Sequence, residues 1–169
     1  MITTQNLTKK FDQITAVENL SLQIPEGEVF GFLGPNGAGK TTTVRMLTSL
    51  ISPTAGSASV NGFQVGEKDI DIRRSVGLLT ETPGLYDNLS AERNLEIYAR
   101  LYEVEDVEGQ VEKYLRFLGL WDRRMDVAAT FSKGMKQKLA IARALLHEPR
   151  TIFLDEPTAG LDPEASRLV

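Results

Sequence analysis

A glycine-rich segment near residue 40 has the residue types and spacing of a phosphate-binding loop. It matches G-x-x-x-x-G-K-[ST] at every fixed position. Glycines let successive backbone N–H groups converge on one phosphate, and a buried strand before the loop and a helix after it favour this reading over a simple turn. Lys40 is expected to reach the β- and γ-phosphates of a nucleotide, and the Thr41 hydroxyl to ligate Mg²⁺. The residues expected to hold the nucleotide are Gly34, Pro35, Asn36, Gly37, Ala38, Gly39, Lys40, Thr41 and Thr42.

Two carboxylates follow the apolar run at 151–154. Asp155 and Glu156 would lie at the carboxyl end of a buried strand, where open α/β sheets bind ligands. Asp155 is suited to hold Mg²⁺ through a water, and Glu156 to orient and deprotonate an attacking water. Alone, such a pair is more often a solvated turn. Together with the phosphate loop it predicts phosphoryl transfer to water, with Glu156 and Lys40 as the catalytic residues.

The elements that must position these residues alternate between strand and helix patterns. Alternating apolar residues predict a strand at 20–24, and a near-continuous apolar run predicts a strand covered on both faces at 29–33. The other expected strands are 57–61, 76–79 and 151–154, and the expected helices are 41–50, one capped by Ser90, one over 107–118 and one over 134–146. This alternation predicts an α/β fold with a mainly parallel sheet.

Composition narrows the class of protein. A chain of 169 residues is long enough for one domain, and its net charge of −4 argues against nucleic acid as a partner. With no cysteine, disulfides and thiolate zinc sites are excluded. No run approaches the roughly 20 apolar residues that span a bilayer, so we expect any membrane-spanning part of the system to belong to another chain.

Two further segments resemble those of one family. Residues 131–137, Phe-Ser-Lys-Gly-Met-Lys-Gln, are similar to the signature segment of ATP-binding cassette (ABC) proteins, and 155–163 resemble that family's Walker B end and D-loop. Asp155 follows Lys40 by 115 positions, which leaves room for a small helical subdomain and none for the long coiled coil of chromosome-maintenance relatives. The amino-acid sequences of residues 34–43 and 159–163 are most similar to those of ATPases of multidrug, antibiotic-resistance and polysaccharide exporters.

The resemblance implies a P-loop NTPase fold with a RecA-like parallel-sheet core, an N-terminal antiparallel β region and an inserted α-helical subdomain. It divides a single, incomplete ATPase domain over 1–169 into a β subdomain with the phosphate-loop core (1–80), a helical subdomain with the signature (81–147), and the Walker B and D-loop segment (148–169). The last core strands and the switch histidine of relatives would follow Val169. We therefore expect the 169 residues alone to be an unstable or inactive fragment.

The resemblance also implies the function. The chain would bind and hydrolyse ATP with Mg²⁺ as the energy-coupling subunit of an ABC transporter, an exporter. It would form a head-to-tail dimer with a second nucleotide-binding domain and serve a membrane-spanning permease subunit at the cytoplasmic face of the cell membrane. Ser132 and Gly134 would contact the γ-phosphate held by the opposite subunit, and Phe11 would stack on adenine. From the residues alone, Ser132 could equally be an ordinary helix cap, and a residue such as Phe11 is more often part of the core than a stacking residue.

The sequence departs from the family pattern in places. Glu81 stands where relatives usually carry Gln, and it could still ligate Mg²⁺. The following loop, with Leu85, Tyr86 and Leu89, would either dock the membrane subunit or form a local apolar cluster. His147 is expected to face solvent near a helix end, because its position is wrong for the switch histidine.

Two alternative functions belong to classes of protein other than transport ATPases. A nucleic-acid or ribosome-associated cassette ATPase would carry two cassettes and basic linkers, and neither is visible. A cassette that only binds ATP is disfavoured for the complete protein by Lys40, Asp155 and Glu156 occurring together, whereas the expected truncation revives this alternative for the 169 residues alone.

Overall fold

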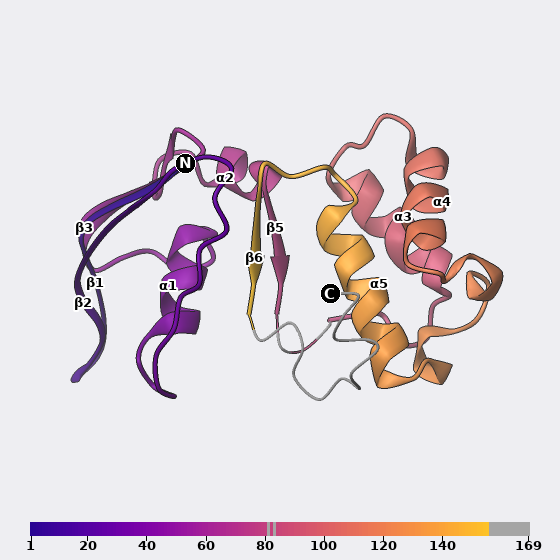
Figure 1. The fold of residues 1–169 in the computed structure, drawn as a ribbon, viewed down its shortest axis with the longest axis horizontal. Helices are drawn as coiled ribbons and strands as arrows, with labels where there is room; N and C mark the ends of the chain where they lie inside the picture. The colour runs from indigo at the N-terminus through magenta and orange to yellow at the C-terminus, as the bar shows by residue number, and fades with distance from the viewer. Residues whose placement is uncertain (81, 83, 156–169) are drawn as a thin grey trace. The chain divides into compact units, whose positions relative to one another are not determined.

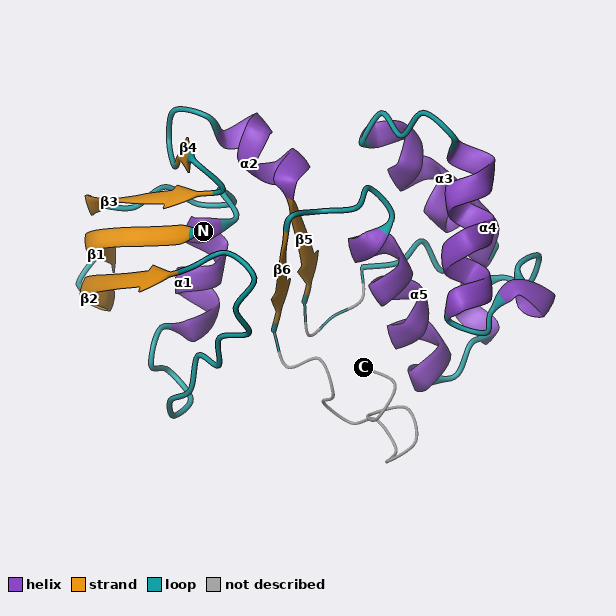
Figure 2. Ribbon diagram, turned by 45° about the horizontal axis from the view of Figure 1, so that its top comes forward, coloured by secondary structure: helices purple, strands orange, loops and turns teal. Residues whose placement is uncertain are grey.

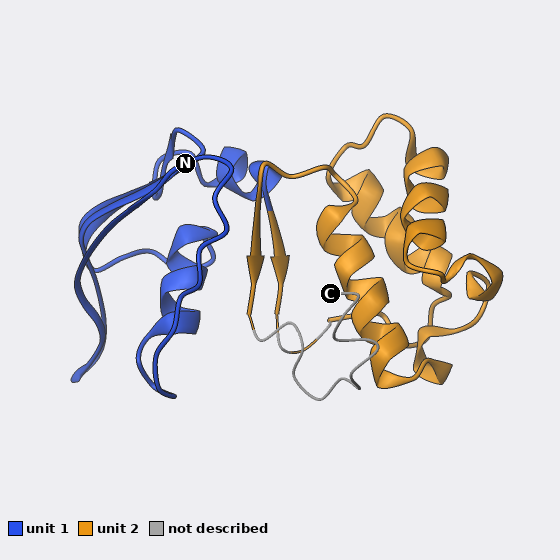
Figure 3. Cartoon of the chain, viewed as in Figure 1, with its two compact units in different colours: residues 1–76 blue, residues 77–169 orange. Residues whose placement is uncertain are grey.

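The computed structural model describes residues 1–80, 82 and 84–155. The chain forms two compact units, residues 1–76 and 77–169, shown in two colours in Figure 3. Each unit is described by itself. No helix of the described residues is both long and apolar enough to cross a membrane.

The first unit is built on an antiparallel sheet. Its strands are β1 (Ile2–Phe11), β2 (Ile14–Ile24), β3 (Ala55–Val60) and β4 (Phe63–Gln64), in the order β2-β1-β3-β4 (Figure 1). β1 and β2 form a hairpin whose register runs from Ile2 opposite Ile24 to Phe11 opposite Ile14. The predicted N-terminal antiparallel region is therefore present, with strands longer than the apolar alternation indicated.

Two helices complete this unit, α1 (Lys40–Leu47) and α2 (Asp69–Ser75). α1 contacts β2 and β3, and its Met46 and Leu47 are buried with Leu7 and Val60 of the sheet. The helix predicted over 41–50 ends earlier. Thr48 folds its hydroxyl back onto the carbonyl oxygen of Val44, and Ser49 takes a positive φ of 55°, which ends the α-helical path.

The second unit contains a two-stranded sheet and a helical cluster. β5 (Val76–Leu79) and β6 (Thr151–Leu154) run in the same direction in Figure 1, as a parallel pair should. The helices are α3 (Ala91–Leu101), α4 (Val107–Phe117), α5 (Lys133–Leu145) and the short 3₁₀ turns η1 (Trp121–Arg123) and η2 (Ala128–Thr130). Leu95, Leu115 and Leu139 are fully buried where α3, α4 and α5 meet. Ser90 caps α3 by accepting from the amide of Arg93, which confirms the predicted cap.

One predicted strand is wrong. Residues 29–33 lie in the long loop between β2 and α1 (Figure 2), and none of the strands described pairs with them. Val29 and Leu33 are almost fully exposed rather than buried on both faces. An apolar run gains a strand's hydrogen bonds and burial only where a neighbouring strand and covering helices are available, and composition alone does not supply them.

Candidate functional site

The glycine-rich loop ends directly in α1. Gly39 is the residue before the helix and has φ 84° and ψ 8°, a left-handed conformation, and Gly37 has φ 83°. No side chain caps α1, so its first-turn N–H groups point at the loop without a side-chain acceptor from the described residues. Free N–H groups at the positive end of a helix dipole suit an anion. The backbone therefore has the geometry that a phosphate requires.

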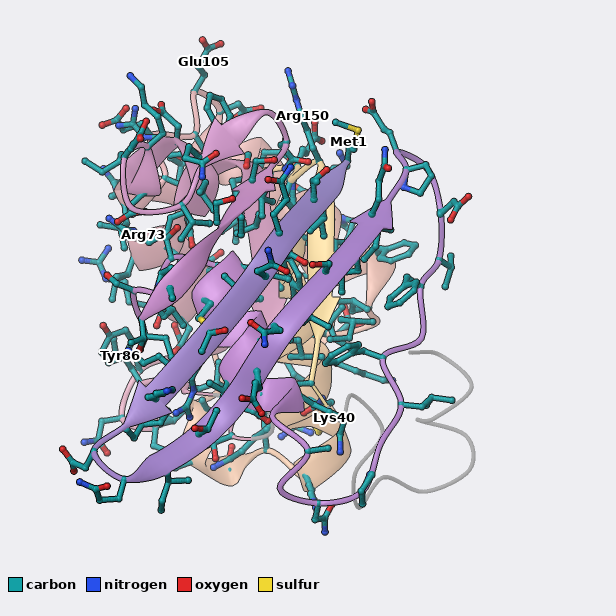
Figure 4. All side chains as sticks on the ribbon, turned by 90° about the vertical axis from the view of Figure 1, so that its left-hand side faces the viewer. Met1, Lys40, Arg73, Tyr86, Glu105 and Arg150 are labelled. Atoms are coloured by element: carbon teal, nitrogen blue, oxygen red, sulfur yellow. The ribbon has the colours of Figure 1, made fainter. Side chains whose placement is uncertain are left out.

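Lys40 places a cation on this loop. Its Nζ donates to the carbonyl oxygens of Gly34 at 2.7 Å and Pro35 at 2.9 Å, so the side chain curls back over the exposed loop (Figure 4). Thr43 fixes the turn, since its hydroxyl donates to the carbonyl oxygen of Gly39 at 2.9 Å and its backbone amide donates to the same oxygen. Thr41 is exposed and Thr42 half-buried in the same first turn. Lys40, Thr41 and Thr42 thus form the first turn of α1, directly after the glycine-rich loop.

Strand β2 of the β1–β2 hairpin packs closely against the end of the glycine-rich loop. A Cβ on Gly39 would lie 2.3 Å from the carbonyl oxygen of Ala16 and 2.9 Å from Val17 Cγ2, so only glycine allows this approach. Phe11 ends β1 on the same hairpin and is 46% exposed, so it is not a core residue. Lys9 Nζ lies 5.0 Å from the centre of the Phe11 ring. An exposed aromatic ring on the strand pair that backs the phosphate loop remains available for stacking.

Asp155 lies where the sequence predicted a metal ligand, at the end of β6. Its backbone N–H donates to the carbonyl oxygen of Leu79 at 2.9 Å, which aligns it with the end of β5. The carboxyl ends of the two parallel strands therefore meet at one edge. Glu156 and Glu81 lie outside the described residues. In the described part of the chain, no three His, Asp or Glu side chains gather as a metal site.

The signature segment begins α5. Ser132 is the N-cap, and its Oγ accepts from the backbone N–H of Met135 at 3.2 Å. This is the capping role that the sequence left open beside the phosphate-contacting one. Gly134 is half-buried in the first turn, and Phe131 packs in the helical core at 5% exposure. Ser132 and the first-turn N–H groups of α5 therefore lie together at the helix start.

Two features of the helical unit were not predicted. His147 is half-buried and stacks on Tyr102 with ring centres 3.9 Å apart, so the expectation of a solvent-facing side chain is wrong. Asn94 is fully buried and accepts a hydrogen bond from the loop before α3, a role that a polar residue on an amphipathic helix does not reveal in sequence.

Of the three apolar residues in that loop, Tyr86 is exposed, Leu85 packs on the helical core and Leu89 is half-buried. The loop thus combines an apolar anchor with an exposed ring.

Ionisable groups with clearly shifted pKa values lie away from these residues. A hydrogen bond from Lys113 lowers the pKa of Glu148 below its ordinary value, and the same bond raises the pKa of Lys113. Burial raises the pKa of the adjacent Tyr114. This group joins α4 to the end of α5 and belongs to the scaffold.

Comparisons with known proteins identify the family. A family model described as ABC transporter matches residues 17–159. The bacitracin transport ATP-binding protein BcrA of Bacillus licheniformis is 43% identical over 163 residues, which cover 96% of this chain and 53% of that protein. The ABC transporter ATP-binding protein NatA of Bacillus subtilis is 41% identical over 99% of this chain and 71% of its own length. The chain thus spans about half the length of BcrA.

Solved structures agree on the fold. The ATP-binding subunit of an ABC transporter superimposes with a TM-score of 0.89 at 34% identity, covering 99% of this chain and 70% of the other. A dimeric ATP-binding cassette in a post-hydrolysis state, bound to ADP and Pi, gives a TM-score of 0.88 at 29% identity, with 99% and 79% covered. The predicted fold class, a P-loop α/β domain with an antiparallel N-terminal region and inserted helices, is confirmed. The chain belongs to the ABC transporter family, and it corresponds to part of that family's ATP-binding subunit.

Proposed function

We propose that this chain carries the ATP-binding and ATP-hydrolysing site of an exporter of the ABC transporter family. The observation that carries the proposal is the loop before α1. Gly37 and Gly39 hold left-handed conformations there, α1 has no side-chain cap, and the Lys40 ammonium group lies on the loop carbonyls. Backbone N–H groups and a cation at a helix start fit the phosphates of a nucleotide, and the exposed Phe11 ring fits its base.

In this proposal each residue has one task. The loop amides and Lys40 would bind the phosphates. By the family resemblance, Thr41, Asp155 and Glu81 would hold Mg²⁺, which would supply positive charge to neutralise the phosphates. Glu156 orients a water and takes its proton as the water oxygen bonds to the γ-phosphorus. The bond from that phosphorus to the bridging oxygen breaks, and ADP leaves with the electron pair. Positioning and charge neutralisation supply most of the rate, so no covalent intermediate on the protein is needed.

The site is completed by a second copy or a second nucleotide-binding domain. Ser132 and the Gly134 amide would contact the γ-phosphate bound by the opposite subunit, since the start of the 13-residue helix α5 offers N–H groups and a positive dipole end. The dimeric structure of a similar ATP-binding cassette supports dimerisation as such. A membrane-spanning partner at the cytoplasmic face would convert closure of the dimer into transport. The similarity to the bacitracin transport protein BcrA supports an antibiotic-like compound as the transported substrate.

The test compares Mg-ATP hydrolysis by the complete protein with that of its Glu156→Gln and Lys40→Ala variants. Glu156→Gln should slow turnover by about 10²–10⁴ and leave ATP bound in a stable dimer. Lys40→Ala should chiefly weaken nucleotide binding. Unchanged turnover in Glu156→Gln would remove that residue as the base, and wild-type ATP affinity in Lys40→Ala would contradict the phosphate-loop assignment. ATP binding without turnover in the complete protein would favour a binding-only cassette.

A further inference from the structure

A buried asparagine on α3 holds the segment that precedes this helix, residues 84–90 (the 84–90 segment). Asn94 is completely buried, and its Oδ1 accepts from the backbone N–H of Tyr86 at 2.8 Å. Its Nδ2 lies within hydrogen-bond distance of the carbonyl oxygens of Ser90 at 2.9 Å, Tyr86 at 3.0 Å and Leu89 at 3.3 Å. The polar atoms of Asn94 are thus committed to the backbone around this one segment.

The same segment forms hydrogen bonds with α5 near both ends of that helix. Lys136 Nζ donates to Asp87 Oδ1 at 2.7 Å, and Lys136 belongs to the first turn of α5, which Ser132 caps. Near the other end of α5, Arg143 Nη1 donates to the carbonyl oxygen of Gly84 at 2.9 Å. The 84–90 segment therefore bridges α3 and α5, with Asp87 fastened to the helix start and Gly84 fastened further along.

The residues before α5 add backbone bonds to this bridge. The amide of Ala128 donates to the carbonyl oxygen of Leu89 at 2.9 Å, and the amide of Ala129 donates to that of Asp87 at 2.9 Å. Asp87 is thus held through both its carboxylate and its carbonyl oxygen by the stretch of chain that leads into and begins α5. Within the second unit, a displacement of Asp87 cannot occur without straining contacts at the start of α5.

The stability of α5 does not explain why a lysine stands at position 136. A cation in the first turn of a helix opposes the helix dipole, and Lys136 therefore costs α5 a small amount that the Asp87 carboxylate offsets. The pair is only partly buried, with side-chain exposures of 28% for Lys136 and 60% for Asp87, so it contributes little to global stability. The distinctive feature of this pair is its location, because it joins the 84–90 segment to the first turn of α5.

We propose that Asn94 and the Asp87–Lys136 ion pair are positioning residues that make the 84–90 segment and the first turn of α5 move as one piece. The inference rests on the proposed function, in which Ser132 and Gly134 contact ATP held by the opposite subunit. The 84–90 segment presents the Tyr86 side chain, 49% exposed, on the surface. ATP engagement of the first turn of α5 should then steady the 84–90 segment.

This effect can be measured on the ATP-binding protein by itself. In the Glu156→Gln protein, Mg-ATP should slow hydrogen exchange of the Tyr86, Ala128 and Ala129 amides by about fivefold, because dimer closure engages α5. Asp87→Asn keeps the side-chain size and removes the charge, and it should reduce this slowing while ATP-dependent dimers still form, because the bonds made by Asn94 and Arg143 remain. Asp122→Asn makes the same charge change on an exposed η1 residue and should keep the full slowing.

Charge reversal and its rescue separate coupling from simple loss of structure. Asp87→Lys and Lys136→Asp should each reduce the slowing, and the two together should restore it. Undiminished slowing in Asp87→Asn, or no restoration in the exchanged pair, would overturn the inference while leaving the proposed function intact. If light scattering shows no ATP-dependent dimer in the Glu156→Gln parent, the head-to-tail arrangement fails, and this inference fails with it.

Discussion

Replacing Gly39 by alanine tests how the hairpin and the phosphate loop fit together. Gly39 has φ 84°, and an added Cβ would lie 2.3 Å from the Ala16 carbonyl oxygen and 2.9 Å from Val17 Cγ2. The left-handed conformation costs an alanine about 1–2 kcal/mol. Because the first contact is with backbone, the strand must move as well, which adds about 1–3 kcal/mol. Gly39→Ala should therefore lower the free energy of unfolding by about 2–5 kcal/mol.

Gly37→Ala is the matched control, since Gly37 has φ 83° and an added Cβ would meet nothing within 4 Å. That variant should lose only the conformational part, about 1–2 kcal/mol. Urea unfolding of the protein and both variants, followed by far-ultraviolet circular dichroism, gives the difference between them. Equal losses for the two variants would show that the close approach of Gly39 to β2 is not what makes glycine necessary there, and the account of the loop's support would be refuted.

Three further changes probe the second unit. Gly77→Ala on β5 would place a Cβ 2.3 Å from the Ala144 carbonyl oxygen, so urea unfolding should show a loss of about 1–3 kcal/mol, and no loss would contradict this packing. Ser132→Ala removes the α5 cap and should cost about 1 kcal/mol in the same assay, whereas Ser132→Asn should restore most of it; equal stabilities of the two variants would argue against capping. The pKa of Glu148 is lowered by its hydrogen bond from Lys113, so this bond adds stability above the ordinary carboxyl pKa of 4.5, which is lost as pH falls through the lowered value. Glu148→Gln should therefore flatten the fall in urea midpoint between neutral pH and about pH 3. An identical pH profile in the variant would show that the bond does not form in solution.

The sequence alone determined the features that depend on residues close together in the chain. The phosphate loop, the Ser90 and Ser132 caps and the placement of Asp155 after a strand all follow from local rules. A left-handed glycine, a helix start or a strand end is specified by a few neighbouring residues. For this reason the expected loop residues were found together around α1, and Asp155 was found level with the end of β5.

Only the tertiary structure decided the features that depend on distant partners. The apolar run at 29–33 reads as a buried strand, yet strand formation requires a neighbouring backbone, and no described strand pairs with it. His147 stacks on Tyr102, and Asp87 pairs with Lys136 across 49 residues of sequence. Such contacts arise because the packing of α3, α4 and α5 brings these side chains together, and no short-range spacing in the chain encodes which residues will meet.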